Sequence, residues 1–238
     1  MGRGPSIEGR KNAEDARRGK LFTKLIREIT IAARSGGADP ASNARLRAGI
    51  DKALTANMTK DTIERALKRA TGADAAKMEE IRYEGYGPSG VALIIDCMTD
   101  NAQRTVADIR HALGKHGGNL GTSGSVAFQF KHVGELVLDT GKPGSEDQLL
   151  EIALDAGADD VQSDSGESVV LTTPENFEAV KKAVLAAGLK PDRADVTWRP
   201  ENRTAVNAEV AETLRDLLDW LDELDDVQAV YHNAELAA

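Results

Sequence analysis

The hydrophobic period of this chain changes between residues 73 and 80, and that change constrains the fold more than any other feature. Before it, apolar residues recur at the helical spacing i, i+3, i+4, i+7; after it, short strand-like runs are interleaved with short helical ones. The segment ADAAKMEE at 73–80 is interpreted as a linker between two kinds of structure. The sequence therefore predicts an α+β multidomain protein, with a helical bundle first and α/β domains after it.

The longest helical stripe of the N-terminal part runs through residues 17–36. Its apolar positions are Phe22, Leu25, Ile26, Ile29, Ala32 and Ala33, and Pro40 follows shortly after its glycine-rich end. Ser42 or Asn43 can cap a second helix, and Thr59 a third. Residues 1–20 have no apolar stripe, so we expect a flexible arm or a frayed helix there. We assign residues 1–77 to this N-terminal domain.

Residues 134–199 alternate between strand and helix patterns in the order β-α-β-β-α-β, which is the ferredoxin-like motif. The expected strands are 135–139, 160–163, 168–172 and 194–199. One helix is expected at 145–156, and another begins at Thr173-Pro174, since proline suits the first helical position. We therefore predict that residues 134–202 form a domain inserted in another one.

Residues 81–131 supply only part of that other α/β unit. They are interpreted as strands 81–86 and 91–98, a helix capped within 99–101, and a strand 126–130 after a glycine-rich segment. The tail is interpreted as strand 204–208, helix 210–224 and strand 227–232, and we expect it to fold back and complete the sheet. This predicts a discontinuous domain of residues 78–133 plus 203–238. The fold is then a helical bundle followed by two ferredoxin-like-type domains, one inserted in the other.

The charge of the chain is divided unevenly along its length. The whole chain has a net charge of -9, yet residues 1–72 hold 16 Lys and Arg against 8 Asp and Glu, while residues 81–238 hold 13 against 28. A basic head on an acidic body indicates a polyanion partner for the head only, because phosphate contacts need clustered Lys and Arg rather than a positive total.

The candidate nucleic-acid-binding residues are the basic side chains of this head. The alternative is that they form the ordinary solvated face of core helices. The candidates are Arg10, Lys11, Arg17, Arg18, Lys20, Lys24, Arg27, Arg34, Arg45, Arg47, Lys60, Arg65, Lys68 and Arg69.

The rest of the sequence offers no constellation for catalysis, a cofactor or a metal. Cys97 is the only cysteine, no histidine pair has zinc-ligand spacing with a third ligand, and neither a GxSxG elbow nor a phosphate loop is present. The acidic run from Asp216 to Asp226 fits no calcium loop and is interpreted as a solvated helix face. The glycine-rich segment 117–125 is interpreted as a helix stop leading into a strand, or alternatively as a loop that contacts a partner. We expect no enzyme activity.

No apolar run in the sequence approaches the length of a membrane span, and residues 1–18 are polar and charged, unlike a signal peptide. We expect a soluble, cytoplasmic protein with no membrane partner. The oligomeric state stays open.

Several long motifs resemble the YebC family of probable transcriptional regulators. They are RRGKLFTKLIREITIAARSGG, KALTANMTKDTIERALKRATG, YEGYGPSGVALIID, GGNLGTSGSVAFQF and LDDVQAVYHNAE. The resemblance implies a helical N-terminal domain followed by two α/β domains. It also implies a regulatory function: some members are described as DNA-binding regulators, while others, including the related mitochondrial translational activator, act on translation through ribosomes or RNA.

Three functions follow from these observations. We expect a DNA-binding transcriptional regulator, with Lys24 and Arg27 contributing phosphate contacts. The alternative is a ribosome-associated translation factor that binds ribosomal RNA with the same basic head and relieves stalled synthesis. An enzyme of unknown type is the third, and it would require a cleft with perturbed titratable groups.

Overall fold

The computed structural model describes residues 7–72, 77–141 and 145–236, with side chains described from residue 15 onward. The chain divides into two compact units. The first combines residues 1–127 with residues 204–238, and the second consists of residues 128–203. The sequence predicted three domains, and their boundaries stay a prediction, because the structure divides into two compact units.

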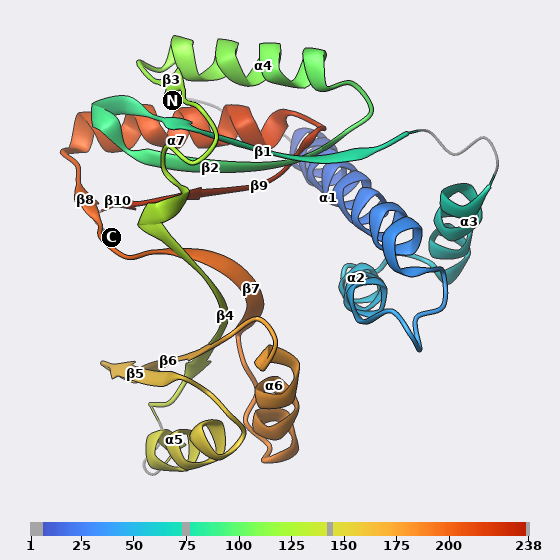
Figure 1. Cartoon of the computed structure of the whole chain (residues 1–238), viewed down its shortest axis with the longest axis vertical. Helices are drawn as coiled ribbons and strands as arrows, with labels where there is room; N and C mark the ends of the chain where they lie inside the picture. The colour runs from blue at the N-terminus through green and yellow to red at the C-terminus, as the bar shows by residue number, and fades with distance from the viewer. Residues whose placement is uncertain (1–6, 73–76, 142–144, 237–238) are drawn as a thin grey trace. The chain divides into compact units, whose positions relative to one another are not determined.

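The first unit begins with three helices, α1 (Ile7–Gly36), α2 (Ala44–Thr55) and α3 (Lys60–Thr71) (Figure 1). The predicted stripe of α1 is confirmed, since Leu25 and Ile29 are buried in a cluster that also contains Leu46 and Ile63. Two of the expected caps are present. The Asn43 side chain accepts a hydrogen bond from the Leu46 N–H at 3.0 Å, and Thr59 accepts one from the Thr62 N–H at 3.3 Å.

The helix α1 begins ten residues earlier than the apolar stripe predicts. It starts at Ile7, so residues 7–16 are helical, which agrees with the helical alternative given for residues 1–20 and not with the flexible one. A stripe marks where a helix packs, but a helix that is already nucleated by packing can continue through residues that bury nothing, because each added residue gains one hydrogen bond. The absence of a stripe was therefore a poor guide to where the helix begins.

The first unit also contains an antiparallel sheet in the order β3-β1-β2-β9. Its strands are β1 (Glu79–Tyr86), β2 (Ala92–Thr99), β3 (Asn119–Leu120) and β9 (Val227–His232). Helices α4 (Ala102–Lys115) and α7 (Ala208–Glu223) cover one face. Leucines of both helices, including Leu113 and Leu217, pack with Leu93 and Ile95 of β2 in one core cluster. A short 3-10 turn, η1 (Pro88–Gly90), joins β1 to β2.

The tail of the chain completes this sheet, as the sequence predicted. Strand β9 pairs with β2, and Val230 lies opposite Ile95. The expected strand 204–208 is much shorter than predicted: β8 (Thr204–Ala205) pairs only with β10 (Ala234–Glu235), in a separate two-stranded ribbon. Asn207 explains where this strand ends, because its side chain caps α7 by accepting a hydrogen bond from the Val210 N–H.

The second unit has the element order that the sequence predicted. Its sheet, in the order β5-β6-β4-β7, is antiparallel throughout. Leu149 of one helix and Val180 of the other pack on Leu136 and Val170 of the sheet. Two helices on one face and this strand order make the unit ferredoxin-like. The elements are β4 (Phe130–Asp139), α5 (Ser145–Asp155), β5 (Asp160–Asp164), β6 (Glu167–Thr172), α6 (Phe177–Ala186) and β7 (Arg193–Pro200).

Two local predictions in this region were wrong. Residues 127–129 form a 3-10 turn, η2 (Ala127–Gln129), and not part of a strand 126–130. Helix α6 begins at Phe177 and not at Pro174, because the Thr173 side chain accepts a hydrogen bond from the Asn176 N–H and holds the chain in a turn. Proline marked the approach to the helix rather than its first turn.

The two strands that bound the second unit lie side by side. Phe130 pairs with Pro200 and Val137 with Arg193, so β4 and β7 are neighbours along their length. The Glu201 N–H also donates to the Gln129 carbonyl at 2.9 Å. The chain therefore leaves the first unit and returns to it at one place.

Candidate nucleic-acid interface

The fourteen basic residues singled out from the sequence have very different surroundings in the structure. Arg10 and Lys11 belong to α1, but their side chains lie outside the described ones. Most of the others are exposed on the surface of the bundle. Lys20, Lys24 and Arg27 are the exceptions, since they lie along the side of α1 that contacts the acidic end of α7.

Each of these three α1 cations forms an ion pair with an acidic residue near the end of α7. Lys20 pairs with Glu223 and Lys24 with Asp222. The side chains of Lys20 and Lys24 are only 27% and 16% exposed, whereas those of Glu223 and Asp222 are 71% and 70% exposed. The acids therefore cover the cations and remain open to solvent on their other side.

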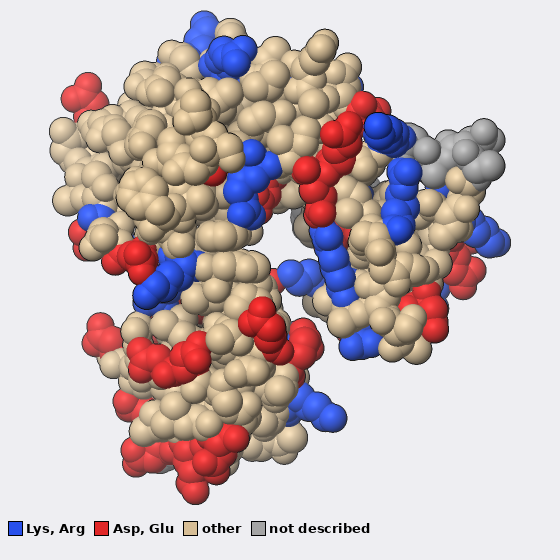
Figure 2. Space-filling model, viewed as in Figure 1, with Lys and Arg blue, Asp and Glu red and all other residues tan. Residues whose placement is uncertain are grey.

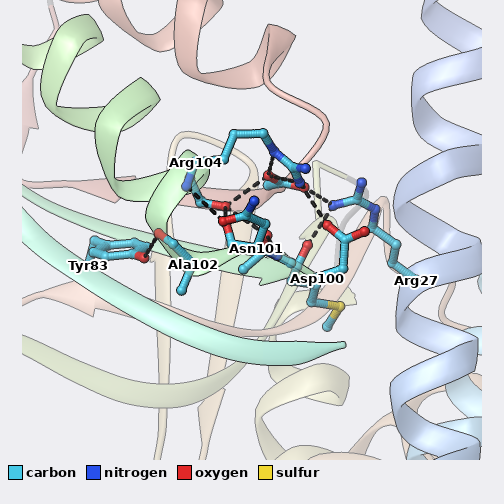
Figure 3. A network of polar contacts seen from close by, with 10 residues as sticks. Arg27, Tyr83, Asp100, Asn101, Ala102 and Arg104 are labelled. Carbon is cyan, nitrogen blue, oxygen red and sulfur yellow. Dashed lines mark hydrogen bonds and ion pairs between the residues drawn. The ribbon is translucent and has the colours of Figure 1, made fainter. Parts of the chain in front are cut away.

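The third pair differs in that its acid is buried. The Nη1 of Arg27 donates to Oδ1 of Asp226 at 2.6 Å and also to the Met98 carbonyl. Asp226 is 6% exposed and accepts two further donors, the Arg104 guanidinium at 2.8 Å and the Thr105 hydroxyl at 2.8 Å. Figure 3 shows Arg27 extending from α1 toward the start of α4, where Arg104 and Asp100 lie.

The protonation of Asp226 is set by two opposing effects. Burial disfavours its charged form, but the hydrogen bonds from Arg104, Arg27 and Thr105 outweigh burial, and the pKa of Asp226 lies below its usual value. The hydrogen bonds from Arg104 to Asp226 and Asp100 raise the pKa of Arg104 in turn. The network therefore keeps its charges at neutral pH, and α1 and α4 share one carboxylate.

The prediction of a solvated acidic face is correct for part of the run only. Asp216 and Asp219 are exposed on α7, but Asp226 is buried and Asp222 and Glu223 are ion-paired. The partners of Asp222 and Asp226 are 198 and 199 residues away in the sequence. No local pattern could have identified them.

Three more of the candidate arginines have carboxylate partners. Arg45 of α2 donates to Glu28 of α1 at 2.7 Å and also pairs with Glu80 of β1. Arg18 pairs with Asp15, and Arg65 pairs with Asp61, each within a single helix and exposed to solvent. Exposed pairs of this kind contribute little to stability, so Arg18 and Arg65 stay open to a stronger anion.

The exposed basic residues that remain are concentrated on α3. Burial of Ile63, Ala66 and Ala70 turns the opposite side of this helix to solvent. Lys60, Lys68 and Arg69 are exposed there, and none has an ion-pair partner in the described part of the chain. Arg17 of α1 is exposed in the same way, and Arg47 of α2 uses its guanidinium on the Pro40 carbonyl at 2.9 Å.

A buried glutamate holds the glycine-rich segment, and sequence reasoning missed it. Glu84 of β1 is 5% exposed and accepts hydrogen bonds from the backbone N–H groups of Gly124 at 2.7 Å, and of Val126 and Ala127 at 2.8 Å. These bonds outweigh burial and lower the pKa of Glu84. The segment is therefore fixed to the sheet, while Thr122 and Ser123 at its tip are exposed.

Comparison with known proteins agrees with this architecture along almost the whole chain. Residues 4–73 match the family model of the TACO1/YebC protein N-terminal domain, and residues 78–234 match that of the TACO1/YebC second and third domain. The chain belongs to the TACO1/YebC family.

Relatives of this TACO1/YebC-family protein carry regulatory names. It is 56% identical to a probable transcriptional regulatory protein of Xanthomonas euvesicatoria, covering 100% of this chain and 99% of the relative. A probable transcriptional regulatory protein of Stenotrophomonas maltophilia is 58% identical, with 100% and 98% covered. A crystal structure of a conserved hypothetical protein from Aquifex aeolicus aligns with a TM-score of 0.82 at 43% identity, covering 94% of this chain and 93% of that one.

The described part of this TACO1/YebC-family protein contains neither a candidate metal site nor a candidate membrane span. Among the described residues, no group of three or more His, Cys, Asp or Glu side chains is placed to hold a metal ion. No described helix is long and apolar enough to cross a membrane. The thiol of Cys97 is buried, which raises its pKa to about 12 and leaves it uncharged at neutral pH.

Proposed function

We propose that this protein is a non-enzymatic regulator of transcription that binds DNA with its N-terminal helical bundle. The names of its relatives support the regulatory role. The observation that carries the proposal is the set of exposed basic residues on α3, Lys60, Lys68 and Arg69, which no carboxylate of the described chain neutralises. Cations in this state are the ones that gain most from a phosphate, because they give up no existing ion pair on binding.

This proposal shifts the expected contact surface within the bundle. The sequence alone favoured Lys24 and Arg27, but Lys24 is paired with Asp222 of α7 and Arg27 with Asp226, which follows that helix. Helix α3 and the exposed residue Arg17 are the surface on which the DNA backbone is expected to bind first. Backbone contacts of this kind give affinity without reading sequence.

Replacement of the three α3 cations tests the proposal. We expect Lys60→Gln/Lys68→Gln/Arg69→Gln to weaken binding to duplex DNA and to lower the slope of log K against log salt by about 2 to 3, since each phosphate contact contributes about 0.9. The control is Lys181→Gln/Lys182→Gln/Lys190→Gln, which removes the same amount of charge from the second unit. Two of these lysines lie on α6, and Lys190 follows that helix. Equal affinities and slopes for the two variants would contradict the proposal.

A ribosome-associated translation factor is the second candidate, and one observation favours it. Residues 128–203 contain 15 Asp and Glu against 8 Lys and Arg. Several groups of acidic side chains lie on the visible face of this unit in Figure 2. Bare duplex DNA repels such a surface, whereas a ribosome offers basic proteins as well as RNA.

Crosslinking in cells, followed by sequencing of the DNA and RNA recovered, distinguishes these two partners. Recovery of DNA fragments together with absence from ribosome fractions supports the first candidate. Recovery of ribosomal RNA, with cosedimentation that survives moderate salt, supports the second. Recovery of neither nucleic acid would exclude both.

A further inference from the structure

We propose that the acidic end of α7 masks the basic side of α1, so that nucleic acid reaches Lys20 and Lys24 only by displacing Glu223 and Asp222. This inference rests on the proposed function and adds a regulatory contact to it. The helical bundle would then bind in two stages, first through α3 and then through α1. In the second stage, Asp222 and Glu223 would compete with the nucleic acid for Lys20 and Lys24.

The position of the acids on α7 is the first argument. Asp222 and Glu223 lie in the last turn of α7, which contains no basic residue. The end of a helix carries a partial negative charge, so acids there are locally unfavourable. Asp225 and Asp226 follow after Leu224 and add to the negative charge at this end of the helix. Their unfavourable position is offset by cations from α1.

The geometry of α1 is the second argument. Lys20, Lys24 and Arg27 follow the spacing i, i+4, i+7, which places them in one row about 10 Å long. Three carboxylates are paired with this row, one to each cation. A nucleic-acid strand presents a charge about every 3.4 Å along its axis, so it offers a comparable row of anions.

The difference in burial among the three pairs is the third argument. Asp226 is buried and held by two arginines, which makes it a fixed anchor. The side chains of Asp222 and Glu223 are about 70% exposed, and each pairs with one lysine only. Exposed ion pairs are weak and are screened by salt. The Lys20–Glu223 and Lys24–Asp222 pairs can therefore open while the Arg27–Asp226 pair stays formed.

The apolar cores on either side of this junction are separate, which is the fourth argument. Leu25 and Ile29 belong to the cluster of the bundle, whereas Leu214, Leu217 and Leu221 of α7 belong to the cluster of the sheet. The contacts that join α1 to the end of α7 are ionic. Opening the Lys20–Glu223 and Lys24–Asp222 pairs thus separates no residues that belong to one apolar cluster.

The test compares two charge-matched variants of the full chain. Asp222→Asn/Glu223→Gln removes the mask, and Asp216→Asn/Asp219→Asn removes two exposed acids of the same helix that have no ion-pair partner among the described residues. The probe is a mixed-sequence DNA duplex of about 20 base pairs, titrated at several salt concentrations. Relative to the control, we expect roughly tenfold tighter binding near 0.1 M salt and a salt slope steeper by up to about 2.

A second measurement reports on the mask without any nucleic acid. The rate at which a lysine-acylating reagent modifies Lys20 and Lys24 is followed residue by residue by mass spectrometry. Removal of the mask should raise both rates several-fold, while Lys60 on α3 and the control variant should not change. Unchanged rates at Lys20 and Lys24 would overturn the inference.

The outcomes separate this inference from the proposed function. If DNA binding depends on Lys60, Lys68 and Arg69 but the Asp222→Asn/Glu223→Gln variant binds no better than its control, masking is wrong and the proposed function stands. If neither the wild type nor any variant binds the duplex at low salt, both the proposed DNA-binding function and the inference that α7 masks it are wrong.

Discussion

At the scale of single residues, two buried carboxylates organise the first unit. Asp226 joins α1 to α4 through Arg27 and Arg104, and Glu84 joins the glycine-rich segment to β1. Each accepts three or more hydrogen bonds, so each is charged and satisfied in the folded state. Removing such a group leaves its donors without a partner, which costs more than the bonds themselves contributed.

We expect Asp226→Asn to lower the free energy of unfolding at pH 7 by about 3 kcal/mol, because Arg27 and Arg104 lose the charge of the buried carboxylate that they share. The pKa of Asp226 is lower in the folded state than its unfolded value of about 3.9. Its contribution is therefore complete above about pH 4 and is lost as the pH falls through the folded pKa. Urea unfolding between pH 7 and pH 2 should show the wild type and the variant converging in acid.

The control for this experiment is Asp225→Asn, the exposed neighbour of Asp226. It should change stability by less than about 0.5 kcal/mol at any pH. A gap between Asp226→Asn and the wild type that stays constant down to pH 2 would show that the ionised carboxylate is not what stabilises the junction.

Interactions between residues close together in the sequence could be predicted, whereas those between residues far apart could not. The caps by Asn43 and Thr59 were predictable, because a cap and the N–H it accepts from lie three residues apart. Asp226 is joined to its arginines across 122 and 199 residues, so nothing near it marks it as buried. The basic composition of the helical bundle could for this reason be read from the sequence, whereas the ion pairs of Lys20, Lys24 and Arg27 could not.

At the scale of elements, the glycine-rich segment after α4 was the hardest part to interpret. The sequence predicted a strand at 126–130, but Glu84 draws the N–H groups of Val126 and Ala127 away from any strand partner. The residues of this stretch have strand propensity, and a distant side chain overrides it. One glycine of the segment is required for a packing reason that is independent of Glu84. Gly118 packs so closely on β1 that a Cβ there would lie 2.2 Å from the Tyr86 carbonyl oxygen.

We expect Gly118→Ala to lower the free energy of unfolding by about 2–3 kcal/mol, because the added methyl group meets backbone that cannot move away. Gly114→Ala, four residues earlier in α4, is the matched control. A Cβ at Gly114 meets no atom within 4 Å, and alanine should stabilise the helix by about 0.5–1 kcal/mol. Thermal unfolding of both variants checks the contrast, which fails if the two shift in the same direction.

At the scale of the whole molecule, the change of hydrophobic period correctly separated a helical bundle from the α/β elements. The fold-back of the tail was also predictable, because residues 81–131 contain too few elements to close a sheet. The lengths of β8 and α1 could not be predicted, since pairing and packing partners far along the chain decide where such elements begin and end. The period of a sequence thus fixes the kinds of element more firmly than their bounds.

The neighbouring strands β4 and β7 lead to a prediction at this scale. Because Gln129 and Glu201 are hydrogen-bonded to each other, a linker of about four Gly and Ser residues can replace residues 130–200 without moving the ends apart. We expect the shortened protein to keep the helical signal of α1 to α4 and α7, and to unfold in one cooperative transition, since its core clusters contain no residue of the second unit. Circular dichroism during heating measures this. Loss of cooperativity would mean that the first unit depends on the second.

The return of the tail to β2 also has a consequence for synthesis of the chain. Strand β2 leaves the ribosome long before α7, the helix that covers part of its apolar face. Roughly a hundred residues separate them. At a rate of synthesis of about 5–20 residues per second, the incomplete sheet therefore lacks α7 for about 5 to 20 seconds. During that interval the second unit has everything it needs to fold, while Leu93 and Ile95 of the first lack the leucines of α7. The nascent chain is thus most exposed to aggregation in the unit that began folding first.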